Sequence, residues 1–182
     1  MAVELGLPVV VKAVSSMLAH KSEVGAVKLN LRSAEQVEAA VQAMAGLSDR
    51  FLVEQMAGDS VAEIIIGVRH DPQFGLALTV GAGGVLVELL RDAVTLLLPV
   101  TRDDVQVALQ SLRCWPLLRG YRGRSTGDLK ALLDTVMAVQ AYARQHAARL
   151  IELDVNPVLV LPEGRGVMAV DALIRLEQEE RR

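Results

Sequence analysis

The sequence has little cysteine, few aromatic residues and almost no surplus charge. The single cysteine, Cys114, excludes an internal disulfide and a metal cluster built on several cysteines. A chain with one thiol is typical of a reducing compartment, so we expect a cytoplasmic protein. We interpret Cys114 as a small buried side chain beside Trp115.

The few aromatic residues (3%) and the hydrophobic content of 52% predict a core built from aliphatic side chains. The net charge of −3 argues against nucleic acid and gives no reason to expect an anionic membrane as a partner. Apolar runs such as 94–100 are too short to span a bilayer. The N-terminus lacks the basic and apolar regions of a signal peptide.

Hydrophobic alternation and turn residues predict a strand-rich chain. The expected strands cover 7–14, 26–31, 51–56, 61–69, 75–80, 85–90, 95–100, 150–161 and 166–171. Capping patterns predict helices that begin after Ser33, after Thr101 and after Ser125, which pairs with Asp128 in a capping-type start, the last helix reaching about His146. Because the strands cluster and do not alternate with helices, we expect an α+β fold with mixed or antiparallel sheets.

Lys12 interrupts the apolar strand pattern around Val9–Val11. A lysine on an edge strand can extend its ammonium group to the solvent, which is the structural interpretation. The functional interpretation is a fixed cation that contacts a phosphate or an adenine nitrogen. The sequence leaves both open.

Two segments could form loops around phosphate groups. His20, Lys21, Ser22 and Gly25 supply cations, a hydroxyl and a flexible backbone, and an imidazole nitrogen can accept a phosphoryl group. The segment 81–84 carries three glycines after a strand, which permits close approach to a ligand. It has no Walker A lysine, and taken by itself a tight turn or bulge explains it better than a ligand site does.

The segment around Asn156 carries the strongest signal. On a strand, Glu152, Asp154 and Asn156 share one face, while the apolar residues between them take the other. Adjacent oxygen ligands of this kind suit Mg²⁺, which usually takes one or two carboxylates together with phosphate oxygens. A solvated polar face of an edge strand is the alternative.

Asp171 ends the last predicted strand. If that strand forms a hairpin with 150–161, the short connection at 162–165 places Asp171 near Asn156. A terminal aspartate is otherwise a common helix cap. The hairpin is therefore what makes Asp171 a candidate metal ligand.

With these residues in view, the chain resembles the ATP-grasp domain of the ADP-forming acyl-CoA synthetases, which also occurs fused in protein lysine acetyltransferases. The resemblance spans nearly the whole chain. It rests on residues 7–13, 20–25, 67–75, 81–84 with Glu88, 116–123 and 152–157, in the order and spacing of the family.

The resemblance implies an ATP-grasp fold with two lobes and the interconversion of acyl-CoA, ADP and phosphate with a carboxylic acid, CoA and ATP. His20 would relay a phosphoryl group from a phosphohistidine of the CoA-binding part. Asn156 and Asp171 would hold Mg²⁺ with Asp154 beside them. The implied nucleotide-binding residues are Lys12, Lys21, Ser22, Gly25, Glu54, Gln55, Glu63, Gly83, Gly84 and Glu88.

The chain departs from the family pattern in two respects. Ala26 stands where the family usually has a second glycine, which restricts the loop backbone. We also expect a single domain over 1–182, with a small lobe over 1–57 and a large lobe over 58–182, that lacks the first helix and strand of the ATP-grasp fold.

The expected partners follow from this organisation. They are CoA-binding and ligase domains of the same protein or of a partner subunit, in an oligomeric parent protein. The alternative function is a non-catalytic regulatory ATP-grasp domain in an acetyltransferase fusion. The sequence carries no legible acyl pocket and does not distinguish ATP from GTP.

Overall fold

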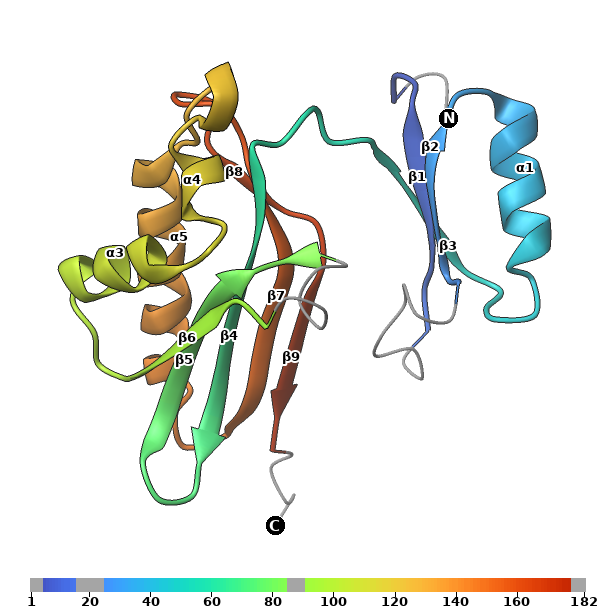
Figure 1. Ribbon diagram of the computed structural model, residues 1–182. Helices are drawn as coiled ribbons and strands as arrows, with labels where there is room; N and C mark the ends of the chain where they lie inside the picture. The colour runs from blue at the N-terminus through green and yellow to red at the C-terminus, as the bar shows by residue number, and fades with distance from the viewer. Residues whose placement is uncertain (1–4, 16–24, 85–90, 178–182) are drawn as a thin grey trace, which may run out of the picture. The chain divides into compact units, whose positions relative to one another are not determined.

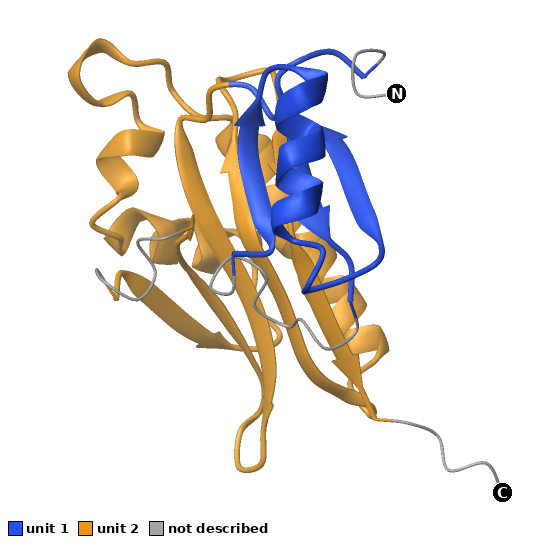
Figure 2. Cartoon of the chain, turned by 90° about the vertical axis from the view of Figure 1, so that its right-hand side faces the viewer, with its two compact units in different colours: residues 1–58 blue, residues 59–182 orange. Residues whose placement is uncertain are grey.

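The computed structural model describes residues 5–15, 25–84 and 91–177 (Figure 1). The chain forms two compact units, Met1–Gly58 and Asp59–Arg182, which are coloured separately in Figure 2. The predicted strand at 85–90 lies outside the described residues. Among the helices of the described ranges, none is both long and apolar enough to cross a bilayer.

Unit 1 is an antiparallel three-stranded sheet with one helix. The strands β1 (Val9–Ala13), β2 (Val27–Leu31) and β3 (Phe51–Gln55) lie in the order β2-β1-β3. The helix α1 (Ala34–Ala43) begins at Ser33, whose hydroxyl accepts a hydrogen bond from the Gln36 backbone N–H. Val11, Ala40 and Met44 form the buried core between helix and sheet.

Unit 2 is built on a larger antiparallel sheet in the order β6-β5-β4-β7-β8, with β9 also paired to β7. Its strands are β4 (Ala62–Asp71), β5 (Gly75–Ala82), β6 (Ala93–Leu97), β7 (Leu150–Val160), β8 (Val167–Ala169) and β9 (Ala172–Leu176). The absence of parallel pairs among the described strands agrees with the clustering of strand patterns in the sequence.

Helices cover one face of this sheet, which we call the helical face (Figure 1). They are α3 (Arg102–Ser111), α4 (Trp115–Leu118), the single 3-10 turn η2 (Tyr121–Gly123) and α5 (Leu129–Gln145). In β4, Ile64, Ile66 and Val68 are fully buried in the core on this side. Because side chains alternate along a strand, Glu63 and Arg69 lie on the opposite face, which we call the polar face.

The structure differs from the sequence predictions in two boundaries and one additional helix. The cap of α5 is Asp128 and not Ser125, because Asp128 Oδ1 accepts from the Ala131 N–H while Oδ2 accepts from the distant Gly166 N–H. The last strand pattern breaks at Asp171, and a further strand, β9, follows it. The short helix α4, with Pro116 in its first turn, was not predicted.

Candidate functional site

Polar side chains of β7 lie on the polar face. Glu152, Asp154 and Asn156 are half-buried, whereas Leu153 and Val155 between them are buried. Asp154 pairs with Gly67 of β4, and an added Cβ on Gly67 would lie 3.4 Å from Asp154 Oδ1. The glycine therefore leaves room for the carboxylate, and the predicted alternation of this segment is present in the structure.

Asn156 lies where the β4–β7 register shifts and contacts two other segments. Its side-chain Oδ1 accepts a hydrogen bond from the Gly84 N–H at 2.9 Å. Its backbone N–H donates to the Asp171 carbonyl at 3.2 Å. Asp171 thus lies opposite Asn156, between β8 and β9, with its Oδ1 accepting from the Ala172 N–H at 3.0 Å.

The glycines at the end of β5 allow this arrangement by close backbone packing. The Gly83 N–H donates to the Glu63 carbonyl at 2.8 Å, and an added Cβ on Gly83 would lie 2.6 Å from the Ile64 carbonyl carbon. On Gly84, which has a φ of +66°, an added Cβ would lie 1.7 Å from Glu63 Oε2. Backbone contact at Gly83 and the positive φ of Gly84 favour glycine at both positions, and the Glu63 carboxylate lies beside Gly84.

The oxygen donors at this end of the sheet are of the chemical type that Mg²⁺ prefers. Within the described residues, no group of three or more His, Cys, Asp or Glu side chains could hold a metal ion by itself. Mg²⁺ does not require such a group, since it commonly takes one or two carboxylates and completes its shell with water and substrate phosphates. Asn156 and Asp171 supply a hard amide oxygen and a carboxylate, and Asp154 adds a second carboxylate two residues along β7.

The other end of the polar face is an ion-pair network around Glu152. Arg69 Nη2 lies 2.5 Å from Glu152 Oε1, and Arg175 Nη1 lies 3.3 Å from Oε2. The hydrogen bond from Arg69 holds the pKa of Glu152 below its usual range, and Arg175 lowers it further. Glu152 is thereby neutralised by arginines.

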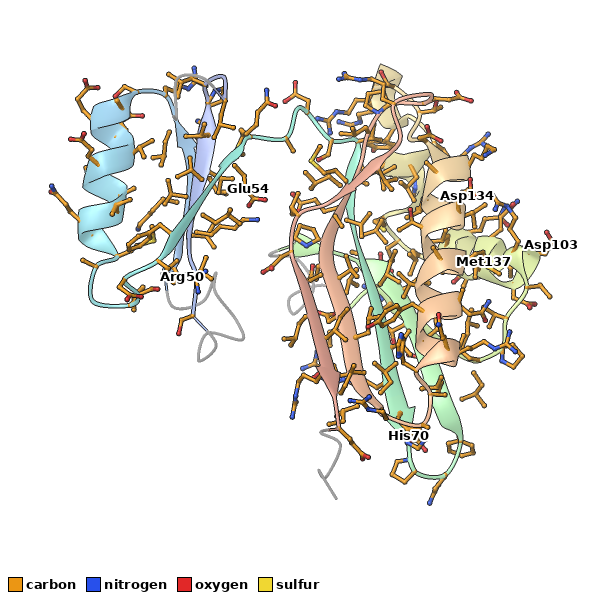
Figure 3. The ribbon with its side chains drawn as sticks, turned by 180° about the vertical axis from the view of Figure 1, so that it is seen from behind. Arg50, Glu54, His70, Asp103, Asp134 and Met137 are labelled. Carbon is orange, nitrogen blue, oxygen red and sulfur yellow. The ribbon has the colours of Figure 1, made fainter. Side chains whose placement is uncertain are left out.

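In unit 1 the structure brings Lys12 and Glu54 together. Lys12 Nζ lies 2.7 Å from Glu54 Oε2, and only 13% of the Lys12 side chain is exposed. Glu54 projects from β3 on the side away from α1 (Figure 3). Lys12 is therefore held at the sheet by a carboxylate and does not extend freely into solvent. Gly25, just before β2, has a φ of +70°, which favours glycine.

Four predicted site residues lie outside the described residues: His20, Lys21, Ser22 and Glu88. Their roles stay predictions, as do those of the residues placed above.

Sequence reasoning missed Asp92, a buried carboxylate that accepts hydrogen bonds from the Arg113 and Cys114 N–H groups. Burial, and then the charge of Asp92, raises the pKa of Cys114 to about 12, so this thiol is not a nucleophile at neutral pH.

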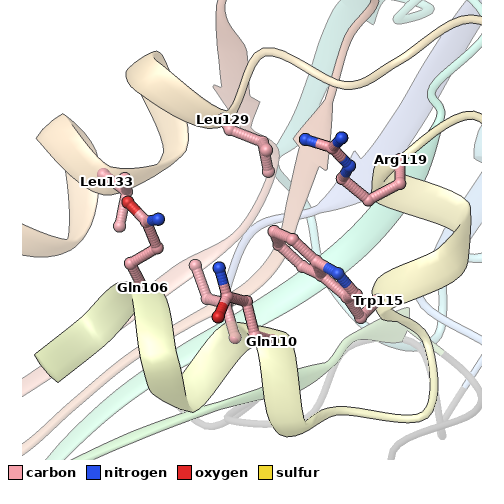
Figure 4. Close-up of a pocket in the computed structure, with 7 residues that line it drawn as sticks. Gln106, Gln110, Trp115, Arg119, Leu129 and Leu133 are labelled. Carbon is pink, nitrogen blue, oxygen red and sulfur yellow. The ribbon is translucent and has the colours of Figure 1, made fainter. Parts of the chain in front are cut away.

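A small cleft lies among the helices of unit 2, away from the polar face (Figure 4). Its volume is about 90 Å³, and it is lined by Gln106, Leu109, Gln110, Trp115, Arg119, Leu129 and Leu133. Pockets that enclose a drug-sized ligand usually exceed about 300 Å³. This cleft is therefore too small to hold a nucleotide.

Comparison with known proteins gives one consistent family. The sequence family described as ATP-grasp domain matches residues 1–176 of this chain. The chain is 33% identical over 182 residues to the beta subunit of an ADP-forming acetate–CoA ligase II from Pyrococcus furiosus, covering 96% of this chain and 77% of that subunit. It is 34% identical to the ADP-forming acetate–CoA ligase I of Archaeoglobus fulgidus, covering 90% of this chain but 25% of that protein.

The fold agrees with solved structures. One is a dinucleotide-forming acetyl-coenzyme A synthetase from Ca. Korarchaeum cryptofilum in complex with coenzyme A and Mg-AMPPCP, whose phosphohistidine segment points towards the nucleotide-binding site. The TM-score is 0.80 at 36% identity, and the match covers 97% of this chain and 79% of that chain. The chain therefore belongs to the ATP-grasp domain family of the ADP-forming acyl-CoA ligases.

Proposed function

We propose that this chain binds ADP or ATP with Mg²⁺ and transfers a phosphoryl group between a phosphohistidine and the nucleotide, as part of an ADP-forming acyl-CoA ligase. The observation that carries the proposal is the junction at Asn156. There, one amide side chain accepts from Gly84 while its backbone contacts Asp171. Glycine backbone, an amide oxygen and carboxylates are groups that can bind a metal ion and phosphate, and this supports the proposal.

Each part of this junction has a proposed role. Asn156 and Asp171 would hold Mg²⁺, with Asp154 beside them, and Gly83 and Gly84 would let the nucleotide approach the backbone. The metal, when bound, neutralises charge on the phosphates during in-line transfer. Glu63 would border the nucleotide from β4, where its carboxylate lies over Gly84.

Unit 1 would supply the cation and the adenine contacts. Lys12 is held in place by Glu54, which leaves a preorganised ammonium group for the nucleotide phosphates. Glu54 and Gln55, at the end of β3, would contact the adenine. Lys21, Ser22 and Gly25 would donate to phosphate oxygens, and Glu88 would add a polar group beside the glycine segment.

His20 would relay the phosphoryl group. Its imidazole nitrogen would bond to phosphorus as the bond to the phosphohistidine of the CoA-binding part breaks. The bond to His20 would then break as an oxygen of the ADP β-phosphate attacks. In the similar synthetase, the phosphohistidine segment points towards the nucleotide-binding site, which supports phosphoryl transfer between that segment and the nucleotide.

The CoA-binding part would lie in the same polypeptide or in a partner subunit. The chain spans about three quarters of the Pyrococcus beta subunit (77%) but only a quarter (25%) of the Archaeoglobus ligase. Acyl recognition would belong to the part that this chain does not match. We place the enzyme in the cytoplasm on the basis of its single cysteine.

The test is ATP formation from acetyl-CoA, ADP and phosphate, with the chain combined with the CoA-binding part of an ADP-forming ligase. We expect His20→Ala and Asn156→Ala each to lower the rate by about 100-fold or more. Asp103→Ala, on the exposed surface of α3, is the control and should keep the rate. Normal rates in both His20→Ala and Asn156→Ala would show that the assigned catalytic site is wrong.

A further inference from the structure

Asp92 is a buried carboxylate at a junction of three segments. Only 7% of the residue is exposed, and among the described residues Gln140 is the other buried polar side chain. Asp92 Oδ1 accepts from the Arg113 N–H and Oδ2 from the Cys114 N–H, both at 2.8 Å. These bonds attach the link before β6 to the corner between α3 and α4.

The backbone of Asp92 is attached to the end of β5. The Ala82 N–H donates to the Asp92 carbonyl at 2.8 Å. Gly81 pairs with Ala93, and an added Cβ on Gly81 would lie 2.6 Å from both the Ala93 Cβ and the Asp92 carbonyl oxygen. The two backbones therefore pack as closely as their atoms allow, so a displacement of Asp92 would displace Gly81 and Ala82.

Gly83 and Gly84 continue this chain of contacts to the metal end. Their N–H groups donate to the Glu63 carbonyl and to Asn156 Oδ1, as described above. A path of hydrogen bonds and covalent backbone thus runs from the α3–α4 corner through Asp92 and the segment Ala82–Gly84 to Asn156. Burial of a carboxylate costs free energy unless its oxygens accept hydrogen bonds. Both Asp92 oxygens accept one, and these charge-assisted bonds connect the α3–α4 corner to the residue that is bonded to the end of β5.

We propose that Asp92 is a positioning residue of the nucleotide site: it fixes the segment Ala82–Gly84 so that the Gly84 N–H meets the Asn156 amide. In this role Asp92 would act through the backbone of β5, to which its carbonyl is hydrogen-bonded, and not by contact with the nucleotide or the metal. The proposal rests on the proposed function for its consequence in binding, but its geometric content, the placement of Gly84, does not depend on it.

The experiment compares Asp92→Asn with a matched control, Gln140→Leu. Gln140 also makes two hydrogen bonds to backbone from a buried position, with the Val100 N–H and carbonyl at 2.6 and 3.0 Å, but on the helical face. Two quantities are measured at a temperature at which circular dichroism shows all proteins folded: the amide hydrogen-exchange rate of Gly84 and the Kd for Mn-ADP.

We expect Asp92→Asn to speed Gly84 exchange and raise the Kd by about tenfold each, because one buried N–H then faces an amide NH₂ group. Gln140→Leu should lower the thermal midpoint but leave both quantities at the wild-type value. Gly81→Ala adds a Cβ that would clash with the Asp92 carbonyl oxygen, so this variant should also speed Gly84 exchange and raise the Kd. It replaces Asp92→Asn in the experiment if Asp92→Asn does not fold.

The outcomes separate the two proposals. Wild-type Gly84 exchange in Asp92→Asn, or in Gly81→Ala if Asp92→Asn does not fold, would overturn the positioning role. An equal acceleration in Gln140→Leu would also overturn it, since it would reveal general destabilisation. Faster Gly84 exchange in Asp92→Asn alone, with no Mn-ADP binding even by the wild type, would support the positioning role and contradict the proposed function.

Discussion

The two faces of the unit 2 sheet differ although the same strands form them. On the helical face, Ile64, Ile66 and Val68 of β4 are fully buried in the core cluster that also includes residues of α3 and α5. On the polar face, the neighbouring Glu63 and Arg69 are exposed. Alternation along the strand thus separates two tasks: one face supplies the apolar burial that stabilises the unit, and the other carries the polar groups.

The comparison also separates the kinds of change that each face tolerates. A side chain on the helical face is surrounded by closely packed atoms, so its loss leaves a cavity. A side chain on the polar face contributes little apolar burial, so its loss should affect ligand binding far more than folding. The predictions below test this separation, from the largest expected effect to the smallest.

The largest effect is expected for Asp171→Asn. This change keeps an oxygen that can accept from the Ala172 N–H but removes the negative charge. We expect the rate of phosphoryl transfer to fall by about 100-fold, because the carboxylate is a proposed metal ligand, with a change of less than about 0.5 kcal/mol in the free energy of unfolding. ATP formation and urea denaturation measure the two quantities. If Asp171→Asn lost much stability but kept a normal rate, Asp171 would contribute to folding and not to ligand binding, which would contradict the assignment.

Ile65 and Ile66 form a matched pair on opposite faces of β4. Ile66 is fully buried on the helical face, so Ile66→Ala should cost about 3 kcal/mol in the free energy of unfolding, as for other buried isoleucines. Ile65 is half-buried on the polar face, and Ile65→Ala should cost less than half as much. Urea denaturation gives both values. Equal costs would mean that the polar face is packed like the core.

A smaller, pH-dependent effect is expected for Glu152→Gln. Because the pKa of Glu152 is lowered in the folded chain, its ionised form adds stability above the unfolded-state pKa of about 4.3. This stability is lost as the pH falls through the lower folded-state value. We expect a difference below about 1 kcal/mol at pH 7, since Arg69 is largely exposed and screened by solvent.

The pH series is read from urea denaturation of the wild type and Glu152→Gln. The difference in unfolding free energy should be constant between pH 7 and about 5 and should shrink below about 4. It should also decrease in about 1 M salt, which screens exposed ion pairs. A difference that grows as the pH falls would contradict the assigned direction of the shift.

Much of the fold could be predicted because its signals are local. The two-residue period of β7, the helix start at Thr101 and the hairpin that brings Asp171 to Asn156 all depend on residues close in the chain. The cap of α5 was misassigned because Asp128 gains a bond from Gly166, 38 residues away, which no local pattern indicates.

The parts of the site that sequence reasoning missed depend on distant partners. The burial of Asp92 follows from the corner at Arg113 and Cys114, more than 20 residues away. The neutralisation of Glu152 follows from the register that places Arg69 and Arg175 beside it, 83 and 23 residues away. Asp92 does not stand out in the sequence, and no residue near Glu152 in the chain indicates its arginine partners.

The central claim is that Asn156 and Asp171 hold Mg²⁺ against a bound nucleotide. Calorimetric titration of ADP, with and without Mg²⁺, into the wild type and Asn156→Ala tests it directly. We predict that Mg²⁺ tightens ADP binding to the wild type by about tenfold or more, and that Asn156→Ala binds metal-free ADP normally but loses this enhancement. An undiminished Mg²⁺ enhancement in Asn156→Ala would contradict the claim.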